Sequence, residues 1–169
     1  MAITTTARNA CEYVRDIGSA LARHWKRTPP LDEQVPFSEI VKILGLDAGL
    51  WCCRAEPQHD KEWRLFAVWC ARQVQHLMTD PRSVAALDVA ERFAHGKATQ
   101  DELSAACDAA TEAQNYAPWG TPANAAKAAQ HALFENAAKA ALSAQEAMLS
   151  AVRSAKRDEA RTEFLKVVG

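Results

Sequence analysis

The chain has 169 residues, of which 49% are hydrophobic, and its formal net charge is -1. This length fits one domain, and this hydrophobic content is typical of a folded protein rather than a disordered one. The near-neutral charge gives no electrostatic reason to expect direct nucleic-acid or membrane binding, and no apolar run reaches the roughly 20 residues that span a bilayer. The polar residues 1–10 contain no signal-peptide core, so we expect a cytoplasmic protein.

The N-terminal third of the chain is predicted to form helices. Apolar residues recur at helical spacing over residues 4–25, which indicates a first helix. Two short helices are expected after a proline-containing connection, one over residues 38–44 and one from Asp47 to about Pro57. No segment alternates with period two over a sustained stretch, so we expect no strands.

Two central helices have clear sequence signals. Residues 60–78 carry apolar side chains on two sides, which indicates a helix near the centre of a bundle. The next helix is expected over residues 81–95, because Asp80 can cap it and Pro81 suits the first helical position.

The C-terminal part, residues 98–169, is rich in alanine pairs spaced three or four residues apart. A capping box at residues 99–102 opens a helix to about Tyr116, and a final helix can run over residues 122–157 without a breaker. Because the turn between them is short, we predict an antiparallel, alanine-lined hairpin in which small side chains let the helices approach closely. Residues 158–168 either continue the last helix or fold back.

These signals together predict an all-α, single-domain bundle of about six to seven helices over residues 1–169. Its expected parts are N-terminal helices (1–57), central helices (58–97) and the alanine-rich hairpin (98–169). The final helix is longer than its predicted partner, so its free portion must pack on the same chain or on another subunit. The second option would make the protein an assembly protein that homo-oligomerises through that helix.

An acidic ridge is predicted on the helix that follows the capping box. No Lys or Arg occurs between Lys97 and Lys127, and Asp101, Asp108 and Glu112 share one helical side. Opposite them we place the buried alanine side, which includes alanines 105, 106 and 109. The ridge is either an ordinary solvated surface or a surface that docks a basic partner, such as a nuclease or another nucleic-acid-binding protein.

Trp119 lies in the Pro-Trp-Gly turn between the two alanine-rich helices. A tryptophan at this place either covers the end of the hairpin or contacts a partner. With Asp101, Asp108 and Glu112, it completes the set of residues that we predict to bind a protein.

No catalytic constellation is recognisable in the sequence. Zinc-binding spacings, phosphate-binding glycine loops and nucleophile-elbow motifs are missing, so we expect no enzyme activity, metal or cofactor. The five cysteines are most simply buried free thiols. An enzyme that uses Cys52 or Cys53 with His59 as the base is the remaining catalytic alternative.

Three segments of the chain carry a family resemblance: residues 47–55 (DAGLWCCRA), 65–77 (LFAVWCARQVQHL) and 81–107 (PRSVAALDVAERFAHGKATQDELSAAC). Together with the alanine-rich tail, over roughly residues 47–151, they resemble the alanine-rich, all-helical immunity protein family found in phages and bacteria. That family often has tryptophan interspersed through its alanine repeats, whereas this tail has only Trp119, at the turn.

The resemblance implies an all-helical domain and supplies no catalytic residues. The word immunity implies neutralisation of a toxin, and an origin in a phage or mobile element implies interference with a host defence, for example as an anti-CRISPR protein. We therefore expect a non-enzymatic inhibitor in the cytoplasm of a bacterial host cell, which blocks a protein partner by occupying its surface. A homodimer is compatible with these expectations.

Overall fold

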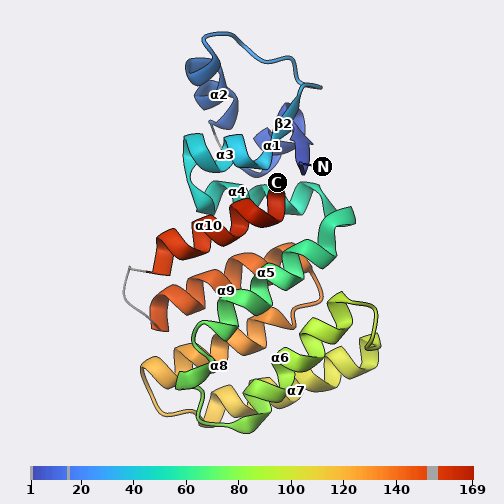
Figure 1. The fold of residues 1–169 in the computed structure, drawn as a ribbon, viewed down its shortest axis with the longest axis vertical. Helices are drawn as coiled ribbons and strands as arrows, with labels where there is room; N and C mark the ends of the chain where they lie inside the picture. The colour runs from blue at the N-terminus through green and yellow to red at the C-terminus, as the bar shows by residue number, and fades with distance from the viewer. Residues whose placement is uncertain (1, 15, 152–155) are drawn as a thin grey trace. The chain divides into compact units, whose positions relative to one another are not determined.

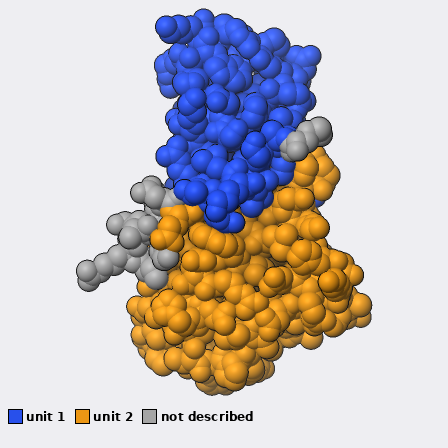
Figure 2. Space-filling view, in the orientation of Figure 1, with its two compact units in different colours: residues 1–57, 161–169 blue, residues 58–160 orange. Residues whose placement is uncertain are grey.

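The computed structural model describes residues 2–14, 16–151 and 156–169, and α-helices dominate it (Figure 1). The predicted all-α class is confirmed. The chain divides into two compact units, Met1–Pro57 with Arg161–Gly169, and Gln58–Ala160 (Figure 2). The expectation that these two units form one domain over residues 1–169 stays a prediction.

The first unit combines short helices with a small sheet. Its elements are β1 (Thr4–Thr6), α1 (Ala7–Tyr13), α2 (Ile17–Trp25), β2 (Gln34–Pro36), α3 (Phe37–Leu44), α4 (Leu46–Cys52), a 3₁₀ turn at Cys53–Ala55 and most of α10 (Lys156–Val168). The expectation of no strands is wrong, because β1 and β2 pair antiparallel, with Thr5 opposite Val35. Three consecutive threonines favour extended backbone, which helical periodicity alone did not reveal.

The predicted helix over residues 4–25 is also divided, and local backbone groups account for the division. Thr6 is the N-cap of α1, where its side chain accepts a hydrogen bond from the Asn9 backbone N–H at 3.1 Å. At the start of α2, Asp16 has the left-handed backbone conformation, with φ of 65°. Such a residue cannot continue a right-handed helix. These breaks raise the number of helices above the predicted six or seven.

The end of the chain completes the core of the first unit. Phe164 and Val168 of α10 are fully buried, and the ring of Phe164 lies 6.5 Å from that of Phe37 between centroids. A Cβ on Gly49 of α4 would lie 2.6 Å from Val41 Cγ2 and 3.2 Å from Phe164 Cε1. Gly49 therefore permits a close approach that any larger residue would obstruct.

The described residues of the second unit form helices joined by short connections. After a 3₁₀ turn at Pro57–His59 it contains α5 (Asp60–Arg72), a 3₁₀ turn at Gln75–Leu77, α6 (Pro81–Ala94), α7 (Gln100–Tyr116), α8 (Thr121–Ala132) and α9 (Ala137–Ala151). Two predicted caps are confirmed: Asp80 accepts from the Arg82 backbone N–H at 2.8 Å, and Thr99 and Glu102 form the capping box. Helix α5 packs against α6, α8 and α9, as its two apolar sides predicted.

The predicted continuous helix over residues 122–157 is wrong, because the chain turns back after Ala132. Helices α8 and α9 form their own antiparallel hairpin (Figure 1), in which Asn124 donates to the Ser150 carbonyl at 3.2 Å and His131 Nδ1 lies 3.0 Å from the Ser143 carbonyl oxygen. The expected α7 neighbour is present as well, since α8 also packs against α7. Residues 152–155 of the predicted helix lie outside the described residues.

Two polar side chains stabilise the turn between α8 and α9. Arg64 of α5 is 3% exposed and donates to the carbonyls of Ala132 and Glu135, at 3.2 and 2.9 Å. Asn136 accepts from the Lys139 backbone N–H at 2.8 Å and so caps α9. Arg64 thus satisfies the Ala132 carbonyl at the end of α8 and the Glu135 carbonyl of the turn that follows.

Alanine burial follows from this arrangement. Helix α8 lies between α7 and α9, and α9 lies between α8 and α5, so the alanines bury more than one side of each helix. The buried alanines of these two helices are 125, 126, 128, 129, 132, 137, 138, 140, 141, 144 and 147. Methyl side chains let neighbouring backbones come into van der Waals contact without loss of rotamer freedom.

Candidate protein-binding site

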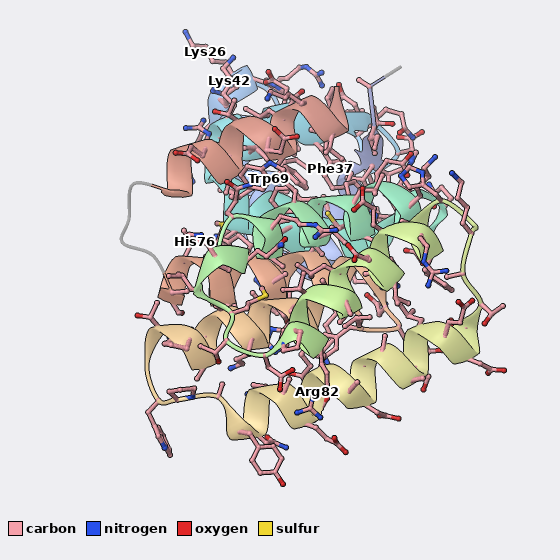
Figure 3. All side chains as sticks on the ribbon, turned by 60° about the horizontal axis from the view of Figure 1, so that its bottom comes forward. Lys26, Phe37, Lys42, Trp69, His76 and Arg82 are labelled. Atoms are coloured by element: carbon pink, nitrogen blue, oxygen red, sulfur yellow. The ribbon has the colours of Figure 1, made fainter. Side chains whose placement is uncertain are left out.

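Helices α6 and α7 form an antiparallel pair that is joined by ion pairs at both ends. Near the start of α6, Arg82 Nη1 lies 2.8 Å from Glu112 Oε2 near the end of α7. At the other end, Arg92 Nη1 lies 3.2 Å from Glu102 Oε1. Figure 3 shows Arg82 beside α7. The predicted uncompensated acidic ridge is therefore corrected: α6 supplies cations that the sequence window between Lys97 and Lys127 did not contain.

Two carboxylates of the ridge keep no ion-pair partner among the described residues, namely Asp101 and Asp108. Both are exposed on α7. Asp101 lies in the first helical turn, where a negative charge is favoured by the helix dipole. The ridge is thus reduced from three free carboxylates to two, about two helical turns apart.

The other carboxylates of this helix pair are occupied. The Thr99 backbone N–H, followed by the Arg92 guanidinium, lowers the pKa of the Glu102 carboxyl. On the α5 side of α6, Arg72 Nη2 lies 2.6 Å from Asp88 Oδ1 and 3.1 Å from Glu91 Oε2. Each of these carboxylates has an arginine partner, so the unpaired negative charge near α7 comes from Asp101 and Asp108 among the described residues.

A groove of about 360 Å³ runs along the seam between α6 and α7. Its lining is mainly apolar and small, and it consists of Arg82, Ala85, Ala86, Val89, Arg92, Glu102, Ala105, Ala106 and Ala109. The predicted burial of alanines 105, 106 and 109 is therefore wrong: Ala105 is exposed and the other two are half-buried. The alanine side is wider than the neighbouring helices can cover, because only Leu103, Ala110 and Ala113 of α7 face the core.

The turn between α7 and α8 presents two large aromatic side chains. Trp119 is 100% exposed and Tyr116 is 81% exposed, which is unusual for residues of this size. Gly120, with φ of +96°, follows Trp119 and precedes α8. Trp119 therefore does not cover the end of the hairpin, and its contact with a partner stays a prediction.

All four predicted site residues lie on α7 or in the turn that follows it. Asp101 and Asp108 are exposed and unpaired within the described chain, Glu112 is paired with Arg82, and Trp119 is free of packing contacts that would bury it. Sequence reasoning missed Tyr116, which follows Glu112 by one helical turn and so lies on the acidic side. We call Asp101, Asp108, Tyr116 and Trp119 together the acidic-aromatic surface.

The catalytic alternative finds little chemical support in the thiols. Cys52 and Cys53 are both fully buried, and burial raises the pKa of the Cys52 thiol to about 12 and that of Cys53 well above its ordinary value. A thiol in this state is not the thiolate that nucleophilic catalysis requires. Within the described residues, no group of three or more His, Cys, Asp or Glu side chains could hold a metal ion.

Comparisons with known proteins add no further information about the site. No family model matches the chain, and neither the curated proteins nor the solved structures contain a significant match. In the described part of the chain, none of the helices combines the length and apolarity of a bilayer-spanning segment.

Proposed function

We propose that this protein is a non-enzymatic inhibitor that binds another protein through the acidic-aromatic surface. The observation that carries the proposal is Trp119, whose side chain is completely exposed in an otherwise well-packed helical unit. Tryptophan and tyrosine supply large contact areas at low cost in conformational entropy, and they are the residues that most often dominate binding energy.

Charge supports a partner with a basic surface. Asp101 and Asp108 are exposed on α7, the helix that ends at the aromatic turn, and have no ion-pair partner in the described chain. Carboxylates placed in this way steer association with a positively charged protein and suppress association with an acidic one. A nuclease or another nucleic-acid-binding protein has such a surface, whereas the inhibitor itself has no charge pattern that favours direct nucleic-acid binding.

The biological setting of the proposal rests on the resemblance to the immunity protein family. We place the protein in the cytoplasm of a bacterial host, encoded by a phage or mobile element. There it blocks a host defence protein, as an anti-CRISPR protein does, or neutralises a toxin. Blocking by occupation of a surface requires neither a catalytic residue nor a cofactor.

Affinity capture from bacterial host lysate tests the proposal with Trp119→Ala as the diagnostic variant. We expect the wild type to retain a stoichiometric protein partner and Trp119→Ala to lose it, because truncation of a central aromatic residue weakens binding by about 30-fold or more. Leu31→Ala is the matched control, since Leu31 is 54% exposed and lies in the other unit. Equal capture by wild type and Trp119→Ala would contradict the proposal.

A self-associating assembly protein is the alternative that the sequence suggested, and light scattering distinguishes the two. The continuous helix on which that alternative was based is interrupted at residues 133–136, and α9 is buried against α5 and α8 of its own unit. We expect the purified protein to be a monomer in dilute solution. A dimer that dissociates on Trp119→Ala substitution would favour self-association instead.

A further inference from the structure

The groove between α6 and α7 has the dimensions of a docking site for a helix. It extends along α6 from Arg82 to Arg92, which is about 15 Å at the rise of an α-helix. The Arg82–Glu112 and Arg92–Glu102 ion pairs close its two ends. Methyl groups form most of the lining, so a partner backbone can approach closely and a large aliphatic side chain can enter.

Asp101 and Asp108 are four and three positions from Ala105 on α7, so they border the groove beside Ala105 rather than opposite it, and they favour a cationic occupant. Asp101 and Asp108 lie on α7 about two turns apart, which is about 10 Å along the axis. Residues 80–116 contain seven Asp and Glu against three Lys and Arg. Five of the carboxylates and the two arginines are paired, which leaves Asp101 and Asp108 against Lys97 among the described residues. A second copy of this chain that docked through the same acidic edge would be repelled, and so would a nucleic acid.

We propose that the α6–α7 groove binds a basic amphipathic helix of the partner protein. This inference rests on the proposed function and specifies the chemistry of the partner. The apolar stripe of that helix enters the groove, and two Lys or Arg residues about two turns apart on its border pair with Asp101 and Asp108. Tyr116 and Trp119, just beyond the Glu112 end, extend the contact past the groove.

Two synthetic stapled helices of identical composition test the inference. The first carries a leucine stripe and two lysines about two turns apart along its border, and the second has the same lysines moved to the opposite face. We expect the first peptide to bind about two- to thirtyfold more tightly than the second, because two exposed ion pairs contribute about 0.2–1 kcal/mol each. Equal affinities for the two peptides would overturn the inference.

Alanine-methyl NMR locates the binding site. We expect the first peptide to shift the methyl signals of Ala85, Ala105 and Ala109 more than those of the α8–α9 hairpin. Shifts confined to other alanines would overturn the inference. Ala105→Gln places a polar side chain in the groove at an exposed position, where folding should tolerate it, and should weaken binding of the first peptide by about tenfold or more.

Charge variants test the acidic edge separately. The double variant Asp101→Asn, Asp108→Asn should bind both peptides equally weakly, and the preference should also fall as salt screens the pairs. Glu146→Gln is the matched control, since Glu146 is an exposed carboxylate on α9. A double variant that still prefers the first peptide as the wild type does would overturn the role of the two aspartates.

Failure of this inference and failure of the proposed function give different results. If partner capture depends on Trp119 but is unchanged in Ala105→Gln and in the double aspartate variant, the groove inference is overturned and the inhibitor function stands. If no Trp119-dependent partner exists and the two peptides are still discriminated, the groove remains a helix-binding site and the inhibitor function fails.

Discussion

Replacement of Arg64 by methionine should destabilise the second unit more than any exposed arginine substitution. Arg64 is 3% exposed, and its Nη1 and Nη2 donate to the carbonyls of Ala132 and Glu135 at 3.2 and 2.9 Å. Its guanidinium carbon also lies 5.0 Å from the centroid of the Phe93 ring. Methionine fills similar space but leaves both carbonyls of the α8–α9 turn without this donor.

The expected loss in stability is the balance of two favourable contributions and one unfavourable contribution. Each hydrogen bond from a charged donor contributes about 1.5–3 kcal/mol, and a desolvated cation–π contact adds about 0.5–2 kcal/mol. Burial of the guanidinium carries a desolvation penalty of several kcal/mol, which methionine does not incur and which also lowers the pKa of Arg64. The net loss in the free energy of unfolding should therefore be about 2–4 kcal/mol.

Urea denaturation followed by far-UV circular dichroism measures this loss at constant m-value. Arg72→Met is the matched control, because Arg72 forms more exposed ion pairs with Asp88 and Glu91 and should cost only about 0.2–1 kcal/mol. Arg64→Lys should fall between the two, since it keeps the charge but loses the planar fork. A loss below about 0.5 kcal/mol for Arg64→Met would refute the reasoning, because that is the range of neutral surface substitutions.

Three further predictions concern packing, buried polar groups and pH. Gly49→Ala should lower the free energy of unfolding by about 1–3 kcal/mol in thermal denaturation, although alanine has the better helix propensity. Gly18→Ala is the control and should not lower it, because its Cβ would meet only a cysteine sulfur at 3.3 Å. Equal melting temperatures for the two variants would contradict the close packing at Gly49. Gln145→Leu should raise the free energy of unfolding by about 1–2 kcal/mol, because both polar atoms of the buried amide lack a hydrogen-bond partner among the described residues. A free energy of unfolding below that of the wild type in urea denaturation would contradict this. Burial lowers the pKa of His131, so the unfolded chain takes up the proton first as the pH falls. The stability that this histidine contributes is present above its unfolded pKa of about 6.5 and is lost on acidification toward its lower folded pKa. His131→Asn should reduce this loss in denaturation curves recorded below about pH 6.5, and an identical pH profile for the variant would count against the prediction.

Sequence periodicity predicted the helices most reliably where a cap defined their start. Asp80 and the Thr99–Glu102 box begin α6 and α7 as expected, since these residues satisfy backbone N–H groups locally. The sequence did not predict the break between α8 and α9, although Asn136 is a strong capping residue. The alanines on both sides of the break favour helix, so the pattern continued across it without interruption. The donor that stabilises the turn, Arg64, is about 70 positions away in the chain.

The candidate site was predicted in part. The sequence placed Asp101, Asp108 and Glu112 on one helical side, and the turn position of Trp119 was also evident. Pairing of Glu112 with Arg82 could not be read from α7 alone, because the cation comes from another helix. The groove could not be predicted from the sequence either, because its existence depends on which alanines of α7 the packing of α6 leaves uncovered.

The sequence by itself determined the all-helical class, the capped helix starts and the spacing of the acidic residues, because these depend on contacts within a few positions of the chain. Only the tertiary structure decided which alanines are buried, which carboxylates are neutralised and that Trp119 is fully exposed. Burial and ion pairing depend on neighbours from distant segments, and a chain so rich in alanine contains few large side chains to indicate which of its helices will meet.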